Sequence, residues 1–134
     1  MLLLLHVEPK AARVLACNSV KTFIFSRRYR LSRRDGFSRI LKARAHTNPW
    51  FAVHSEPNTQ TNARLGVTVG KRVAPSAVLR NRIKRQIREA FRLLGDARVA
   101  RDIVIRLRKV PDAVDKVAAQ LALNESIQRA LQQK

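Results

Sequence analysis

The stretch that decides the fold spans residues 76–94 and reads SAVLRNRIKRQIREAFRLL. Its apolar residues recur at a spacing of three and four, which predicts an amphipathic helix. They are Leu79, Ile83, Ile87, Ala90, Phe91 and Leu94. Six of the other thirteen positions are cationic and only one, Glu89, is acidic. Like charges four residues apart repel by about 0.2–0.5 kcal/mol per pair. We therefore expect the apolar side of this helix to pack on a core and its cationic side to bind a polyanion.

The composition of the whole chain points to the same partner. Its 134 residues include 28 Lys and Arg but only 9 Asp and Glu, which gives a formal net charge of +19. Such an excess of cations is typical of nucleic-acid-binding domains. The length and the 46% hydrophobic content suit one domain with a modest core.

The sequence argues against several other kinds of site. Cys17 is the only cysteine, which excludes a disulfide framework and a thiolate metal cluster and fits a cytoplasmic location, and no role follows for Cys17 itself. The apolar run at residues 2–5 is too short to span a bilayer, and no Lys or Arg precedes it, so we expect neither export nor membrane anchoring. The nine acids are dispersed, so we expect no metal site and no nuclease activity of the protein alone. We also expect no small-molecule substrate.

The first twenty residues read differently from the rest of the chain. Residues 1–20 show no sustained period and contain Pro9, which favours a poorly ordered tail. We also consider that this segment is not translated and that the natural start is a valine codon at Val20. Residues 21–134 are expected to form a single RNA-binding domain.

The remaining elements follow from periodicity. A short amphipathic helix is predicted at 35–44, strands at 50–56, 65–70 and 102–108, and a hairpin-type loop at 57–62. A last helix, opened by Pro111, carries Val114, Val117, Leu121, Ile127 and Leu131. The order αββαβα predicts an α+β fold in which helices pack on one face of a small sheet and leave part of the other face free.

Several of these segments together resemble the bacterial ribonuclease P protein subunit. The resemblance covers roughly residues 25–108, and it is specific because the motifs recur in order. The motifs in the long helix are Ala77-Val78, Arg80-Asn81-Arg82, Lys84-Arg85 and Arg88-Glu89. Those outside it are Tyr29-Arg30-Leu31 followed by Phe37, the run LGVTVGKR at 65–72, and the strand DIVI at 102–105.

The resemblance implies both a fold and a function. The implied fold is like domain 2 of ribosomal protein S5, with a left-handed crossover between parallel strands. The implied function is that of the protein subunit of a ribonucleoprotein that hydrolyses one phosphodiester bond to remove the 5′ leader from precursor tRNA. In this family the RNA subunit and its Mg²⁺ ions carry out catalysis, and the partners of the protein are that RNA and precursor tRNA.

The resemblance also assigns roles to residues. Those matching the RNA-contacting surface are Lys71, Arg72, Arg80, Asn81, Arg82, Lys84, Arg85, Arg88 and Arg92. Those matching the cleft for the leader are Phe37, His54, Tyr29 and Arg30. The sequence leaves open whether Val53 or His54 occupies the position on the first central strand. Leu41 departs from the family, because many relatives carry a second aromatic residue there.

Other RNA-binding roles remain possible on the sequence alone. A ribosome-associated structural protein or an RNA chaperone would share this charge. A DNA regulator would need a helix-turn-helix, and the strands on both sides of the basic helix argue against that arrangement.

Overall fold

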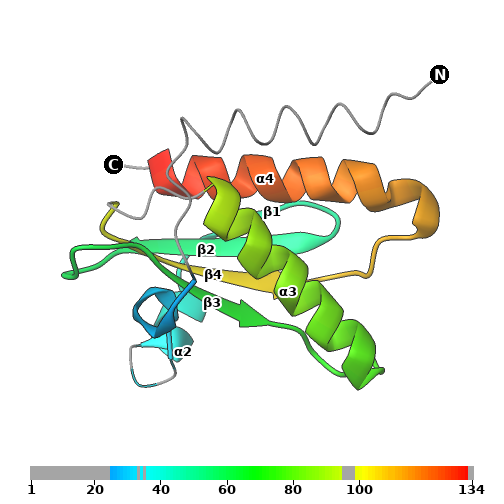
Figure 1. Cartoon of the computed structure of the whole chain (residues 1–134), viewed down its shortest axis with the longest axis horizontal. Helices are drawn as coiled ribbons and strands as arrows, with labels where there is room; N and C mark the ends of the chain where they lie inside the picture. The colour runs from blue at the N-terminus through cyan, green and yellow to red at the C-terminus, as the bar shows by residue number, and fades with distance from the viewer. Residues whose placement is uncertain (1–24, 33, 35, 95–98, 133–134) are drawn as a thin grey trace.

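A four-stranded mixed sheet lies at the centre of the computed structural model, which describes residues 25–32, 34, 36–94 and 99–132 (Figure 1). The strands are β1 Ala45–Thr47, β2 Phe51–Pro57, β3 Arg64–Thr68 and β4 Arg101–Leu107. Their order in the sheet is β1-β2-β4-β3. β2 is antiparallel to both of its neighbours, whereas β3 is parallel to β4.

The alternation of side chains gives the sheet two different faces. On β2, Phe51 and Val53 join the main core, while Ala52 and His54 point to the opposite face, as the sequence predicts. The central strand β4 is buried on both faces, which explains its unbroken β-branched run 103–105.

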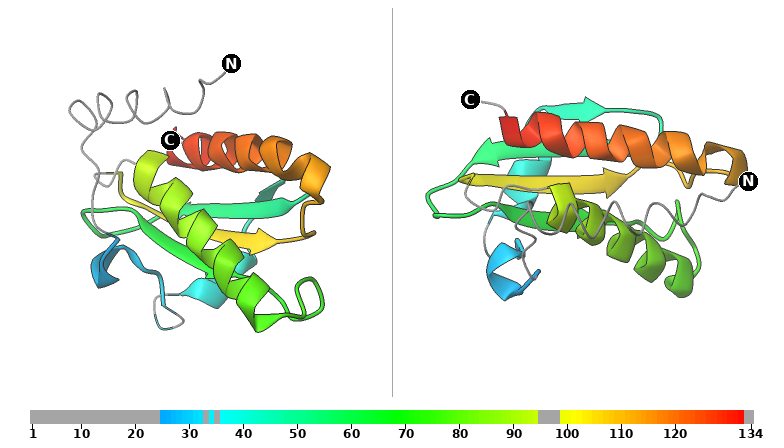
Figure 2. Two further views of the ribbon diagram at one scale, coloured as in Figure 1. Left: turned by 45° about the vertical axis from the view of Figure 1, so that its right-hand side comes forward. Right: turned by 45° about the horizontal axis from the view of Figure 1, so that its top comes forward.

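Two long helices cover one face of the sheet. They are α3 Ala77–Leu94 and α4 Lys116–Gln132, and both views in Figure 2 place them on the same side. Ser76 caps α3, because its Oγ accepts a hydrogen bond from the backbone N–H of Leu79 at 3.3 Å. Four residues of the predicted apolar sector of α3 are buried, namely Ile83, Ile87, Ala90 and Phe91, with Ile87 and Phe91 fully enclosed against the sheet and α4, and Leu79 is half-buried.

A shorter helix packs against the opposite face. α2 Phe37–Leu41 follows a 3-10 turn at Arg27–Tyr29, and Gly36 enters it with φ +91°, a conformation that glycine adopts without strain. Ile40 of α2 is fully buried with Leu31 and Val104 in a second, smaller core. The helices therefore do not all lie on one face, and α2 leaves part of the second face uncovered.

The connection through α3 has an unusual hand. β3 and β4 are parallel neighbours, and α3 joins them. In Figure 1 both strands run to the right, α3 lies in front of the sheet, and the chain passes from the lower strand to the upper one. This crossover is left-handed, as the family resemblance implies, although about 98% of such connections are right-handed.

The structure differs from the sequence-based expectations in other elements as well. The loop at 57–62 does not form a hairpin, because β4 lies between β2 and β3. Strand β1 was not predicted, and α2 is shorter than the helix expected at 35–44. On the last helix only Ile127 and Leu131 of the expected apolar positions are buried, whereas Val114, Val117 and Leu121 are exposed. The expectations for residues 1–20, including Cys17 and a start at Val20, lie outside the described residues.

Candidate nucleic-acid interface

The cations of α3 are divided between two sides of the helix. Asn81, Arg85 and Arg88 face the chain segment that precedes α2, since they line a hollow together with Arg30. Arg82 lies on the side that faces α4. Four cations of α3 have no acidic partner among the described residues. They are Arg82, Lys84, Arg85 and Arg88. The basic helix therefore presents uncompensated charge in two directions.

The hollow beside Arg85 is built by two parts of the chain that are far apart in sequence. It has a volume of about 390 Å³ and is lined by Phe25, Arg30, Asn81, Arg85, Arg88 and Glu89. Phe25 is anchored edge-to-face on the buried ring of Phe91, with the centroids 5.8 Å apart. The Arg30 guanidinium carbon lies 5.7 Å from the centroid of the Phe25 ring, within the range of a cation–π contact. The Phe25 ring thus positions Arg30 beside the cations of α3.

Crowded positive charge is the main electrostatic property of this hollow. Burial, and then the charge of Arg30, lowers the pKa of Arg88 below that of a free guanidinium. Arginine nevertheless stays protonated in proteins. The hollow therefore holds cations at some electrostatic cost, which an anionic ligand such as phosphate would relieve.

Two other cations of α3 already have partners within the protein. Arg92 donates to both carboxylate oxygens of Glu89, at 3.0 and 2.5 Å, and this hydrogen bond lowers the pKa of Glu89. Arg80 donates to the carbonyl oxygens of Ala74 and Pro75, at 2.9 and 2.8 Å. Arg80 thereby fixes the loop that carries Lys71 and Arg72, both of which are exposed.

The residues predicted for a leader cleft do not gather at one place. Phe37 lies over β3, where a Cβ on Gly66 would come within 2.4 Å of its ring, so the glycine makes room for the phenylalanine. The Phe37 ring is half-buried. Tyr29 stacks against the Arg28 guanidinium, 5.2 Å from the centroid of the Tyr29 ring. Arg30, as described above, lies with α3 rather than beside Phe37.

The structure shows on which face of the sheet Val53 and His54 lie. Val53 belongs to the main core, whereas His54 lies on the face that carries α2. The His54 side chain is only 5% exposed, and its Nδ1–H donates to the carbonyl oxygen of Ala43 at 2.9 Å. Its Nε2 is buried without a hydrogen-bond partner among the described residues. In this conformation the ring is not available for stacking on a base.

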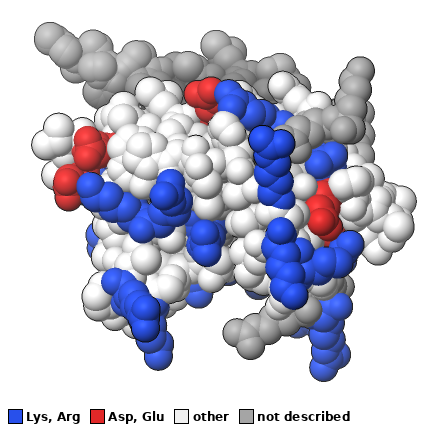
Figure 3. Space-filling view, turned by 180° about the vertical axis from the view of Figure 1, so that it is seen from behind, with Lys and Arg blue, Asp and Glu red and all other residues white. Residues whose placement is uncertain are grey.

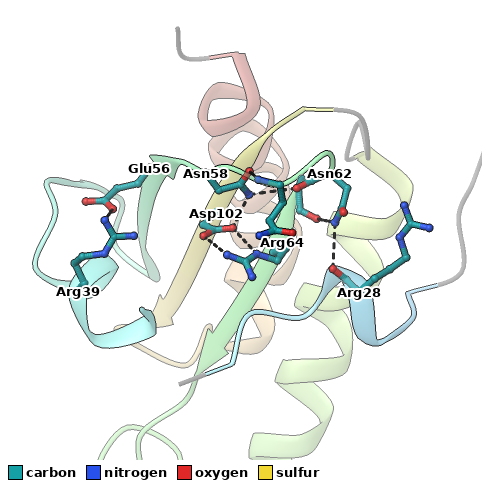
Figure 4. A network of polar contacts seen from close by, with 9 residues as sticks. Arg28, Arg39, Glu56, Asn58, Asn62, Arg64 and Asp102 are labelled. Carbon is teal, nitrogen blue, oxygen red and sulfur yellow. Dashed lines mark hydrogen bonds and ion pairs between the residues drawn. The ribbon is translucent and has the colours of Figure 1, made fainter. Parts of the chain in front are cut away.

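A polar network fixes the segment that carries Tyr29 and Arg30 (Figure 4). Arg64 makes a two-pronged contact with Asp102, at 2.9 and 2.8 Å, and Asn58 donates to the same carboxylate at 2.7 Å. Asn62 donates to the backbone carbonyl of Arg28 at 3.1 Å. The backbone N–H of Leu31 then donates to Leu65 on the outer edge of β3 at 2.9 Å. These contacts determine where Arg30 meets α3.

Comparison with known proteins decides the family. The family model for ribonuclease P matches residues 25–131. The ribonuclease P protein component of Chromobacterium violaceum is 40% identical over 90 residues, which cover 66% of this chain and 74% of that protein. The corresponding protein of Azoarcus sp. strain BH72 is 38% identical over 74% of this chain and 80% of its own length. The chain belongs to the ribonuclease P protein family.

A solved structure agrees with this assignment. The ribonuclease P protein of Staphylococcus aureus superimposes with a TM-score of 0.58 at 33% identity, over 77% of this chain and 92% of that one. As a ribonuclease P protein, this chain is a subunit of the endonuclease that processes precursor tRNA. The α+β fold and the RNA-cleaving complex expected from the motifs are thus confirmed.

In the described part of this ribonuclease P protein, four carboxylates contact arginines. Besides Asp102 and Glu89, Glu56 contacts Arg39 at 3.3 Å and Glu125 contacts Arg129 at 3.0 Å. In the described part of the chain, no three His, Cys, Asp or Glu side chains are grouped as a metal site would require. Among the described helices, none is both long and apolar enough to cross a membrane.

Sequence reasoning missed two residues of the candidate interface. Phe25 orders Arg30, and its signal was only an isolated aromatic before a basic run. Arg106 is exposed on β4, beside Thr68, on the sheet face that α2 leaves partly open. Its place was predictable, because it follows the alternation of the strand. On the side of the molecule away from α3, Lys and Arg side chains are spread across the surface and Asp and Glu side chains are few (Figure 3).

Proposed function

We propose that this protein binds the RNA subunit of ribonuclease P through α3 and Arg30, and that it holds the 5′ leader of precursor tRNA on the sheet face beside α2. The chain contributes charge and position, and the RNA subunit contributes the chemistry. Such a role belongs in the cytoplasm, together with precursor tRNA.

The hollow between Arg30 and α3 carries the proposal for the RNA subunit. Arg30, Arg85 and Arg88 converge there with Asn81, and Glu89, the one acid in the lining, is already paired with Arg92. Guanidinium groups bind phosphate through paired hydrogen bonds, and an amide can donate and accept beside them. The convergence of unpaired guanidinium groups from two segments suits a folded RNA backbone. The exposed pair Lys71 and Arg72 extends the same charge beyond the N-terminal end of α3.

The face beside α2 supports the proposal for the leader. Phe37 offers a half-buried ring above Gly66, and Arg106 offers a cation on the same face of the sheet. Aromatic rings that stack on bases, combined with cations that contact phosphates, bind single strands with little dependence on sequence. His54 supports the floor of this face from below and does not contact the leader in this conformation.

We assign the hydrolysis and its Mg²⁺ ions to the RNA subunit. Asp102 is 1% exposed and accepts hydrogen bonds from Arg64 and Asn58, so its oxygens are not available to a metal. Mg²⁺ bound to RNA would supply charge stabilisation and an activated water. The residues of this chain would act only by binding and orienting the two RNAs.

Reconstitution tests the proposal. We expect the purified protein to leave precursor tRNA uncut and the complex with its RNA subunit to cut it. Arg85→Ala should reduce the slope of log K for the RNA subunit against log salt by about 0.7–0.9, because one phosphate contact is lost. Arg129→Ala removes an equal charge from α4 and should leave the slope unchanged. Efficient cleavage by protein without RNA, or equal slopes for the two variants, would contradict the proposal.

A further inference from the structure

A second hollow lies between α3 and α4, on the side of α3 away from Arg30. We propose that it is a pocket for one unpaired base of the RNA subunit. This inference rests on the proposed function, because it presupposes that α3 contacts that RNA. The pocket would contact a base, whereas the hollow at Arg30 offers mainly contacts to phosphate.

The pocket exists because the two helices diverge. α3 and α4 lie close together near their C-terminal ends and spread apart toward their N-terminal ends, as Figures 1 and 2 show. The space between them has a volume of about 370 Å³, within the usual range for small-ligand sites. Phe51, Ile83 and Leu123 form a buried apolar floor, and Val110 and Pro111 line it from the segment between β4 and α4.

The rim of the pocket has a different chemistry from its floor. Arg82 and Gln86 come from α3, and Lys116 and Gln120 come from α4. All four side chains are exposed. No acidic residue lines the pocket. Among the described residues, Arg82 makes no hydrogen bond or ion pair, and Gln120 contacts only Asn124, on its own helix at 2.9 Å.

This combination favours a nucleotide over other occupants. An apolar floor suits the flat faces of a base, and two amides, each able to donate and accept, suit its hydrogen-bonding edge. The two cations, with no acid among them, suit the attached phosphate and disfavour an acidic or a purely apolar peptide. Arg82 also sits on the helix that already faces RNA, so a strand bound along α3 passes the mouth of the pocket.

Affinity measurements give the first test, using the full-length protein and its RNA subunit. Gln86→Ala combined with Gln120→Ala should weaken binding on the order of tenfold, because contacts to one base are lost. The slope of log K against log salt should stay unchanged, because no charge is removed. Arg85→Ala, in contrast, should lower that slope. A double variant that binds like the parent protein would overturn the pocket.

Crosslinking gives the second test and identifies the base. A benzoylphenylalanine residue incorporated at position 120 should crosslink to a single nucleotide of the RNA subunit. The same group at position 128, which is also exposed on α4, should give no such crosslink. A crosslink from position 120 to the protein itself, or to scattered nucleotides, would overturn the pocket. If the parent protein binds the RNA and supports cleavage in those cases, the proposed function stands without the pocket. If the parent protein does not bind the RNA, both proposals fail.

Discussion

Whether an arginine of α3 can reach RNA depends on what its guanidinium already contacts. Arg85 is exposed and has no partner among the described residues, whereas Arg80 is bound to two backbone carbonyls and Arg92 to Glu89. Residues that look equivalent in the motif therefore differ in their role. Arg80 fixes the loop before the helix, and Arg92 is engaged by Glu89.

Glu89→Gln tests this reading of Arg92. The substitution removes the negative charge of Glu89 from the lining of the hollow, together with the carboxylate that accepts from Arg92. We expect binding of the RNA subunit to strengthen several-fold at low salt, and the slope of its salt dependence to rise by up to about 0.9. Glu125→Gln is the matched control, because it removes the carboxylate that accepts from Arg129 on α4. Equal effects of the two substitutions would show that only net charge matters.

Phe37→Ala tests the leader site. If a base stacks on the ring, its loss should weaken binding of precursor tRNA to the assembled enzyme by about 1–3 kcal/mol and leave mature tRNA unaffected. Leu41→Ala is the control, because Leu41 packs against the same small core without offering an aromatic ring. Gly66→Ala should act like Phe37→Ala, because the new Cβ would displace the ring. Equal penalties for precursor and mature tRNA would assign Phe37 to packing alone.

At the level of elements, the Arg64–Asp102 pair joins the two parallel strands at the end where α2 and the 3-10 turn meet the sheet. The side chains are 15% and 2% exposed, so the pair is largely removed from water. Asp102→Ala should lower the free energy of unfolding by about 3–5 kcal/mol, because it leaves the Arg64 charge buried without its carboxylate. Chemical denaturation measures this.

The exposed pair Arg39–Glu56 provides the comparison for that measurement. Its side chains are 67% and 27% exposed, and Glu56→Ala should cost at most about 1 kcal/mol. Similar losses for the two substitutions would mean that the Arg64–Asp102 pair contributes through its polar surroundings rather than through burial of charge.

Periodicity predicted the elements that bury a regular apolar face. Helix α3 could be placed from its apolar residues three and four positions apart, and strands β2 and β4 could be placed from their alternating or β-branched side chains. The basic face of α3 followed from the same helical spacing. Strand β1 was missed because its three residues, Ala45–Thr47, carry no repeating pattern. The hairpin was wrong because alternation determines which face a side chain takes but not which strand lies alongside.

The candidate site was harder to predict than the fold. The helical spacing predicted that Arg85 and Arg88 lie on the side of α3 away from the core, and both line the hollow there. Arg30 reaches that face only because residues 30 and 31 lie along the outer edge of β3, a contact between distant parts of the chain. The burial of His54 likewise depends on a hydrogen bond to Ala43 from a segment whose path periodicity does not reveal.

For the molecule as a whole, the net charge of +19 is not needed for folding, which it opposes through self-repulsion. In the described part of the chain most cations lie at the surface, and the half-buried Arg64 is paired with Asp102. RNA binding would relieve the remaining repulsion, so the complex should be more stable than the free protein.

Deleting residues 2–20 tests how much of the chain forms the domain. Every buried apolar residue in the described part of the chain lies between Leu31 and Leu131, and the deleted segment contributes only +1 to the net charge, from Lys10 and Arg13 against Glu8. We therefore expect an unchanged thermal midpoint and unchanged affinity for the RNA subunit. A deletion of residues 2–26 also removes Phe25, which packs on Phe91 and holds Arg30 beside α3. That longer deletion should lower both quantities, so a loss already complete in the shorter one would place part of the RNA-binding domain before residue 21.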